Sequence, residues 1–210
     1  SELLKNKART IRVKEADNVL DEVFFQAMAN ERDIIVDSGG GDDANRLLEL
    51  LSVQPQDNIK YIIPTTVGAD DTNVMKTYKL IPNKNNILFV LNGYHDLENL
   101  KEEFLFFFGD ADDDIEGVVG KIKGKLHYLL IPFSNLYKVA QLKYNMTVLD
   151  LANLSKNLTP EEASKVFITE SAGDPLAYRA LYKRYKQSVR AQKLIDEIMY
   201  NLSKIDKQVA

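Results

Sequence analysis

The sequence predicts an α/β fold in which helices cover both faces of a mostly parallel sheet, followed by a helical C-terminal extension. In the first two-thirds of the chain, short β-branched runs alternate with amphipathic stretches, and residues 86–92 form a continuous apolar run typical of a buried parallel strand. After Thr147 no strand signal follows. Strands separated by helices of about ten or more residues form βαβ units. We therefore expect an α/β domain over residues 1–154 and a helical extension over residues 155–210.

The elements of the N-terminal half follow one another as strand and helix. A strand is expected at residues 9–13, and the helix at 16–29 has apolar side chains spaced along one face. The short hydrophobic strand at 33–37 ends in Ser38 and three glycines, and the helix at 44–51 places its leucines on one face. The next strand, at 60–64, is closed by proline. Each of these segments therefore fits a repeating βα pattern.

The second half continues this pattern and then becomes helical. The remaining expected elements are a helix at 70–81, a strand at 86–92, a helix at 96–108, a strand at 126–131 and a helix at 135–144. Thr159 and Pro160, followed by two glutamates, are typical of a helix start with a capping hydroxyl. Asp174 and Pro175 open another helix, whose apolar side chains recur every three or four residues to the C-terminus.

Composition excludes several kinds of site. The chain has 27 basic and 31 acidic residues, no cysteine and two histidines. Disulfides, thiolate zinc sites and cysteine nucleophiles are therefore excluded, and a multi-histidine metal centre is not expected. His127, within an expected strand, is predicted to be a structural histidine with satisfied hydrogen bonds. No signal-peptide pattern and no apolar run of membrane-spanning length are present, so a cytoplasmic location is expected.

The sharpest local motif is the apolar strand that ends at Asp37 and is followed by glycines. A parallel strand delivers such a carboxylate to its C-terminal edge, where open α/β sheets bind ligands. Glycines beyond it let backbone amides approach an anion closely. A tight turn with a capping aspartate would explain the same residues.

With this motif the chain, over residues 8–154, resembles the ParA/MinD branch of P-loop ATPases (SIMIBI class), most closely the partition ATPases of conjugative plasmids. Three further segments agree in order and spacing: Tyr61-Ile-Ile-Pro-Thr-Thr66, Phe89-Val-Leu-Asn92 and Leu130-Ile-Pro-Phe-Ser134. The resemblance implies a cytoplasmic ATPase of plasmid or DNA segregation that binds ATP and Mg²⁺ and acts with a partition partner or a second subunit. It implies that Asp37 holds the metal through water. It further implies that Gly39 and Gly40 sense the γ-phosphate and that Asn92, Pro132 and Ser134 line the adenine pocket.

The phosphate loop of that family is missing. No G-x-x-x-x-G-K-[ST] motif occurs, so the expected sheet has a gap beside the strand that ends at Asp37. We expect a fragment of a longer ATPase, or alternatively a relative that has lost nucleotide binding, and in either case no activity and no bound cofactor in this chain alone. Two other classes stay open: a non-enzymatic interaction module with this fold, and a receiver-like domain whose Asp37 binds Mg²⁺.

Two charged segments complete the candidates. The acidic run from Asp110 to Asp114 lacks the glycine and glutamate of a calcium loop and is predicted to be a solvated loop. The stretch from Pro175 to Lys193 contains six cations and no acidic residue, and it could bind the phosphates of DNA without sequence preference or form a solvated helix face. The six cations are Arg179, Lys183, Arg184, Lys186, Arg190 and Lys193.

Overall fold

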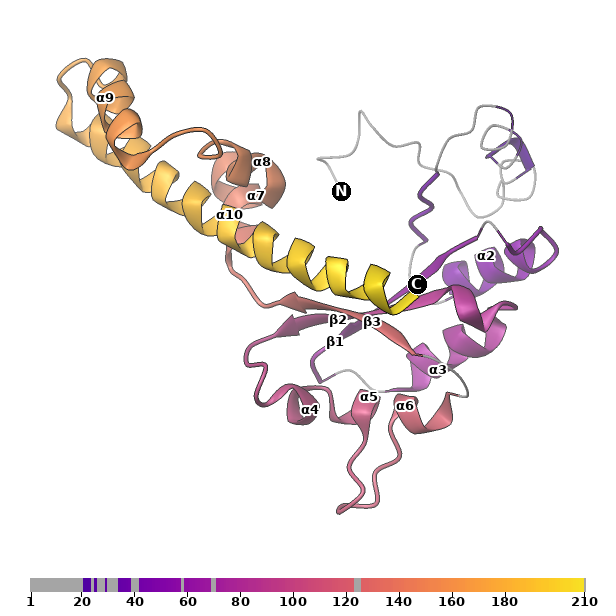
Figure 1. The fold of residues 1–210 in the computed structure, drawn as a ribbon. Coiled ribbons are helices and arrows are strands. Elements are labelled where there is room, and N and C mark those ends of the chain that lie inside the picture. Colours follow the sequence, from indigo (N-terminus) through magenta and orange to yellow (C-terminus); the bar gives the residue numbers. More distant parts are fainter. Residues whose placement is uncertain are drawn as a thin grey trace. The chain divides into compact units, whose positions relative to one another are not determined.

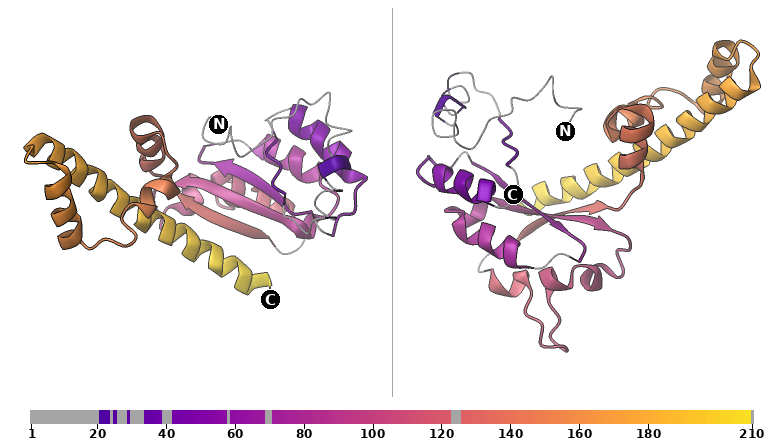
Figure 2. Two further views of the ribbon diagram at one scale, coloured as in Figure 1. Left: turned by 90° about the horizontal axis from the view of Figure 1, so that it is seen from above. Right: turned by 180° about the vertical axis from the view of Figure 1, so that it is seen from behind.

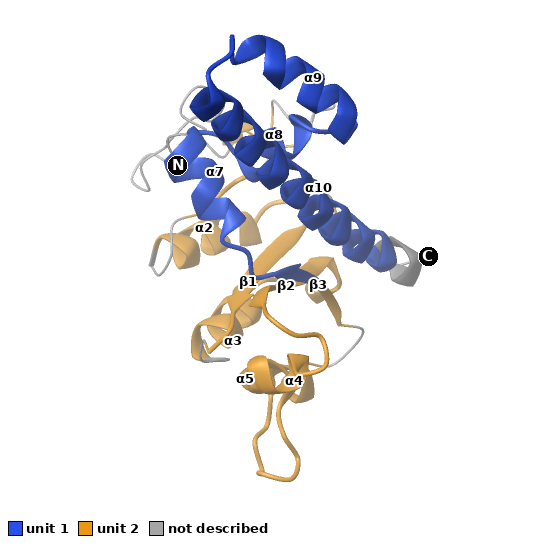
Figure 3. Ribbon diagram, turned by 90° about the vertical axis from the view of Figure 1, so that its left-hand side faces the viewer, with its two compact units in different colours: residues 1–6, 130–210 blue, residues 7–129 orange. Residues whose placement is uncertain are grey.

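The computed structural model describes residues 21–23, 25, 29, 34–38, 42–57, 59–68, 71–122 and 126–209. The chain divides into two compact units, shown in Figure 3. Unit 1 comprises residues 1–6 and 130–210, and unit 2 comprises residues 7–129. This division lies within the last strand, whereas the sequence predicts a boundary at residue 154.

Within the described residues the sheet contains three strands, which confirms the predicted α/β class and its parallel strands. They are β1 (Tyr61–Thr66), β2 (Ile87–Tyr94) and β3 (His127–Pro132), hydrogen-bonded in the order β1-β2-β3. The β1–β2 register pairs Tyr61 with Ile87 at one end and Thr66 with Asn92 at the other. The strands predicted at 60–64, 86–92 and 126–131 are therefore confirmed, each with small shifts at its ends.

Four helices of unit 2 lie on one side of this sheet (Figure 1): α3 (Asp71–Leu80), α4 (Leu100–Glu103), α5 (Leu105–Phe108) and α6 (Val118–Lys121). Figure 2 gives two further views. The ring of Phe89 in β2 packs against Phe107, with centroids 5.4 Å apart, and Phe107 also contacts Tyr128 in β3. Side chains along β1 alternate between buried and exposed, as in a strand covered on one face. Two further helical segments of this unit are α2 (Asp42–Ser52) and η3 (Lys84–Asn86).

The helix predicted at 96–108 is instead two short helices. The break lies at Phe104, whose backbone has φ −116° and ψ 44°, and whose side chain is fully buried. Before it, the Glu103 carboxylate accepts hydrogen bonds from the backbone N–H groups of His95 (2.8 Å) and Asp96 (3.1 Å). The Glu103 carboxylate therefore binds the backbone N–H groups at the place where the predicted helix would begin, and residues 95–99 form no helix.

Unit 1 is helical after β3. Its helices are α7 (Leu136–Tyr144), α8 (Val148–Asn153), α9 (Pro160–Glu170) and α10 (Pro175–Val209). Thr147 and Asp150 form a capping box that starts α8, a helix that the sequence analysis missed. Small and aliphatic side chains of α7, α8 and α10 share one core, which is why α7 and α8 group with the C-terminal helix. These buried core residues are Leu136, Ala140, Leu151, Ala152, Ala191 and Leu194.

The strand predicted at 33–37 is wrong for the residues that the structure describes. Residues 34–38 have no regular secondary structure and are exposed, with Ile35 94% accessible. These residues are not paired with the β1-β2-β3 sheet. Apolar, β-branched residues favour a strand, but this preference does not specify a neighbouring strand to which they hydrogen-bond. The strand predicted at 9–13 lies outside the described residues, whereas 21–23, 25 and 29 are helical within the predicted 16–29 helix. Among the described helices, none is long and apolar enough to cross a membrane.

Candidate functional site

The carboxyl ends of β1 and β2 bring polar side chains together at one edge of the sheet. Thr66 is the register partner of Asn92, and both residues are exposed. Neighbouring Thr65 is only 2% exposed, and its Oγ1 has no hydrogen-bond partner among the described residues. Because side chains alternate between the two faces of a strand, Thr65 lies on the opposite face of β1 from Thr66, and the exposed polar groups at this edge are those of Thr66 and Asn92.

The local sequence explains this arrangement. Tyr61, Ile63 and Thr65 alternate inward along β1, so the threonine that follows them faces outward. In β2 the buried run ends at Leu91, and Asn92 is the first exposed side chain after it. A role was expected for Asn92 and none for Thr65, because the residues of β1 do not alternate between apolar and polar types and so do not indicate which of them face inward.

The other two residues predicted for an adenine pocket belong to unit 1, whereas Asn92 belongs to unit 2. Pro132 is the last residue of β3 and is buried. The Ser134 hydroxyl accepts a hydrogen bond from the backbone N–H of Leu136 at 3.2 Å, where α7 begins. Ser134 therefore has a local structural partner, and the joint role of the three residues stays a prediction.

The predicted metal ligand does not lie at a strand end. Asp37 is exposed within the irregular segment 34–38, and Gly39 and Gly40 lie outside the described residues. Within the described ranges, no group of three or more histidine or acidic side chains could hold a metal ion. The magnesium role of Asp37 and the γ-phosphate role of the glycines stay predictions.

A second candidate site is the cationic stripe, which we define as Arg179, Lys183, Lys186, Arg190 and Lys193 of α10. Their spacing of four, three, four and three residues places them along one face of the helix over about 21 Å. All five are exposed, and in the part of the chain that the structure describes none forms an ion pair with a carboxylate. The stripe is therefore an uncompensated positive surface on a chain of net charge −4.

Arg184, the sixth predicted cation, does not belong to the stripe. It follows Lys183 directly and so lies about 100° around the helix from it. Its guanidinium carbon is 5.3 Å from the centre of the Tyr144 ring, and within the described part of the chain its buried Nε has no hydrogen-bond partner. The six cations counted in the sequence are therefore five exposed side chains of the stripe and one, Arg184, that packs against an aromatic ring.

Comparisons with known proteins identify no relative. No protein-family model, curated protein or solved structure matches the chain.

Proposed function

We propose that this chain belongs to a nucleotide-dependent partition ATPase of the ParA/MinD type, acting in plasmid or DNA segregation. It would be either a part of a longer protein that carries the phosphate loop or a form that has lost that loop. The observation that carries the proposal is the β1–β2 register, which sets Thr66 beside Asn92 at the carboxyl ends of parallel strands. Ligands of open α/β sheets bind at this edge.

The chemistry of the edge is compatible with an adenine base. An exposed amide offers both a donor and an acceptor, which matches the amino group and the ring nitrogen of adenine. ATP and Mg²⁺ enter this proposal through the motif resemblance, with Asp37 as the proposed metal-binding carboxylate.

The test is ATP binding by the complete gene product in its wild-type form and as Asn92→Ala. Loss of one hydrogen bond to the base should weaken ATP binding about tenfold, since such bonds contribute about 1–1.5 kcal/mol. Asn99→Ala is the matched control, because that asparagine is also exposed and its side chain donates a hydrogen bond to Asp96 within the same loop. Equal affinities of wild type and Asn92→Ala would contradict the adenine role.

A second candidate function is nonspecific binding of duplex DNA through the cationic stripe. It would suit either a partition ATPase or a non-enzymatic interaction module. Five aligned cations without carboxylate partners can neutralise successive phosphates, and each neutralised phosphate releases condensed counterions. The observation that favours this function is the uninterrupted 4-3-4-3 spacing on an exposed face of α10.

The expected result for Lys186→Glu/Arg190→Glu is a loss of duplex binding of more than about tenfold for every sequence. The slope of log affinity against log salt should fall by about two, because two phosphate contacts are removed. Lys204→Glu, on the same helix but beyond Asp196 and Glu197, is the control that should retain binding. Fluorescence anisotropy at several salt concentrations measures both quantities. Binding unchanged in the double variant would exclude the stripe as the DNA surface.

A further inference from the structure

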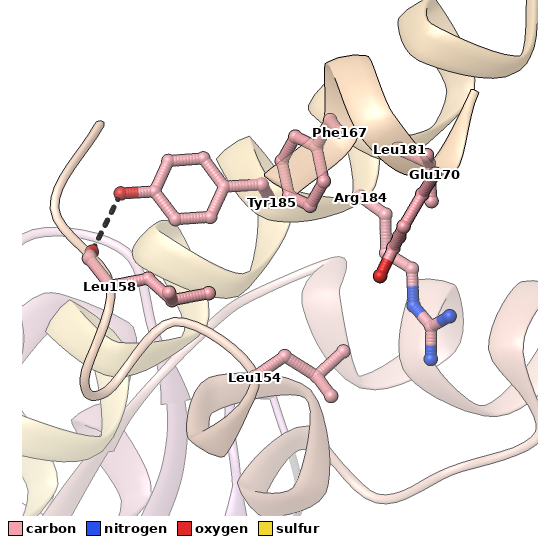
Figure 4. A pocket seen from close by; sticks show the side chains of 7 residues that line it. All are labelled: Leu154, Leu158, Phe167, Glu170, Leu181, Arg184 and Tyr185. Carbon is pink, nitrogen blue, oxygen red and sulfur yellow. Dashed lines mark hydrogen bonds between the residues drawn. The ribbon is translucent and has the colours of Figure 1, made fainter. Parts of the chain in front are cut away.

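Unit 1 contains a small apolar pocket beside the cationic stripe. Its volume is about 150 Å³, which is sufficient for one aromatic ring or one branched aliphatic side chain. Figure 4 shows the lining side chains, with the Tyr185 hydroxyl donating a 3.0 Å hydrogen bond to the Leu158 carbonyl oxygen. The lining residues come from α9, α10 and the segment after α8: Leu154, Leu158, Phe167, Glu170, Leu181, Arg184 and Tyr185.

A cationic hollow of about 300 Å³ adjoins this pocket and shares Leu181 and Arg184 with it. Lys143 of α7 and Lys183 of α10 also line the hollow, and no carboxylate does. None of the three cations has an ion-pair partner among the described residues, and the buried Nε of Arg184 has no acceptor. The two hollows together suit a ligand with an apolar group next to several negative charges.

The same chain presents such a ligand on unit 2, in the acidic hairpin, defined here as residues 110–116. A backbone bridge between Asp110 and Ile115 closes it, and Figure 1 shows the segment between α5 and α6 projecting from that unit. Asp112, Asp113, Asp114 and Glu116 are exposed and without ion pairs among the described residues. Ile115, between two of these acidic residues, is 37% exposed.

We propose that the acidic hairpin of one copy of this chain docks on unit 1 of a second copy. The Ile115 side chain enters the 150 Å³ pocket, and the neighbouring carboxylates bind Lys143, Lys183 and Arg184 in the cationic hollow. The apolar side chain supplies burial, and the opposite charges supply orientation and rate of association. Because the two surfaces differ, the contact is head-to-tail and can extend to further copies.

Glu170 should weaken the association of the two copies. It lines the apolar pocket beside Arg184, so it should repel the incoming carboxylates. Glu170→Gln is therefore expected to tighten association by about twofold to fivefold at low salt. A purely apolar contact would not respond to this substitution in a salt-dependent manner.

Sedimentation equilibrium of the full chain at low and high salt is the first test. A hairpin buries little surface, so we expect a dissociation constant on the order of 10–100 μM that weakens as salt rises. Lys143→Glu/Arg184→Glu, Asp112→Lys/Asp114→Lys and Ile115→Ser should each weaken association about tenfold or more. Lys186→Glu/Arg190→Glu, on the same helix outside the hollow, should leave it unchanged. A chain that stays monomeric at all concentrations would overturn the proposal.

Mixing two defective variants is the decisive test. Asp112→Lys/Asp114→Lys retains an intact hollow and Lys143→Glu/Arg184→Glu retains an intact hairpin, so a mixture should form one heterodimeric contact. A labelled cyclic peptide of residues 109–117 should bind the first variant and not the second. No heterodimer and no peptide binding would overturn the proposal. It would also be overturned if Lys143→Glu/Arg184→Glu lost duplex DNA binding and kept wild-type association, since the hollow would then bind nucleic acid.

Discussion

Gly109 and Gly117 bring the two stems of the acidic hairpin into direct backbone contact. A Cβ added to Gly117 would lie 2.3 Å from the backbone nitrogen of Gly109 and 2.4 Å from the carbonyl carbon of Phe108. Gly109 also has φ +77°, a conformation that other residues adopt at a cost. The two glycines therefore let the backbone after α5 contact the backbone before α6, and Gly109 also supplies the positive φ of the turn.

Gly117→Ala is expected to lower the free energy of unfolding by about 1–3 kcal/mol, because the methyl group would meet backbone that cannot move aside cheaply. Gly120→Ala is the matched control. The added Cβ there would have Glu116 Cγ as its nearest atom, at 3.4 Å, and alanine is the better helix former in α6. Urea denaturation of both variants measures the difference. Equal stabilities would show that the stems can separate without cost.

His127 shows why single residues are harder to predict than elements. It begins β3, as its position in an apolar run predicts. The expectation that its hydrogen bonds are satisfied is not met among the residues that the structure describes, where the buried Nδ1 has no partner. A strand pattern fixes which face a side chain lies on, whereas its partner comes from a segment distant in sequence. Thr65 is a second buried polar group of this kind.

At the scale of elements, the start of α9 was predicted from local sequence, whereas the similar capping box at Thr147 and Asp150 was missed. Thr159 and Glu162 form the capping box expected from their sequence, and α9 begins at Pro160. The carboxylate of Glu162 accepts hydrogen bonds from the Thr159 backbone N–H (2.8 Å) and hydroxyl (2.9 Å). Such signals are local, so the sequence contains all of them. Whether residues 34–37 pair with a neighbouring strand and where the helix breaks at Phe104 depend on tertiary contacts, and no local pattern predicted the observed outcome at either place.

The capping box should make stability depend on pH. The hydrogen bond from the Thr159 backbone N–H, followed by the one from its hydroxyl, lowers the pKa of Glu162. A lowered folded-state pKa adds stability above the unfolded value near 4.3, and this stability is lost as pH falls through the folded value. Glu162→Gln should therefore be less stable than wild type at neutral pH, and the difference should shrink below about pH 4.

Urea denaturation at neutral and acidic pH, with Glu161→Gln as the control, checks this expectation. Glu161 lies in the same turn, and its replacement keeps both hydrogen bonds between Thr159 and Glu162. The control should therefore keep the wild-type dependence of stability on pH. A constant difference between Glu162→Gln and wild type across this range would show that the carboxylate charge contributes nothing to the cap.

For the whole molecule, the sequence predicted the α/β class and three strands that correspond to β1, β2 and β3, whereas the division between the two compact units lies within β3 and not at the predicted residue 154. The reason is that α7 and α8 follow the last strand as an ordinary βα unit would. Their core side chains nevertheless pack with Ala191 and Leu194 of α10, more than thirty residues further along the chain. Periodicity identifies the apolar face of each helix and says nothing of which partner covers it.

The last prediction concerns the 210-residue chain itself: it should not turn over ATP in the presence of Mg²⁺. Phosphoryl transfer depends almost wholly on positioning and charge stabilisation by a phosphate loop and its lysine, and the sequence contains no such motif. The measurement is phosphate release by the purified chain, with Asp37→Ala and Asp43→Ala as a matched pair of exposed carboxylates. Turnover that survived in Asp43→Ala and disappeared in Asp37→Ala would contradict the prediction. It would show that the exposed segment at residues 34–38 becomes a phosphate site when the nucleotide binds.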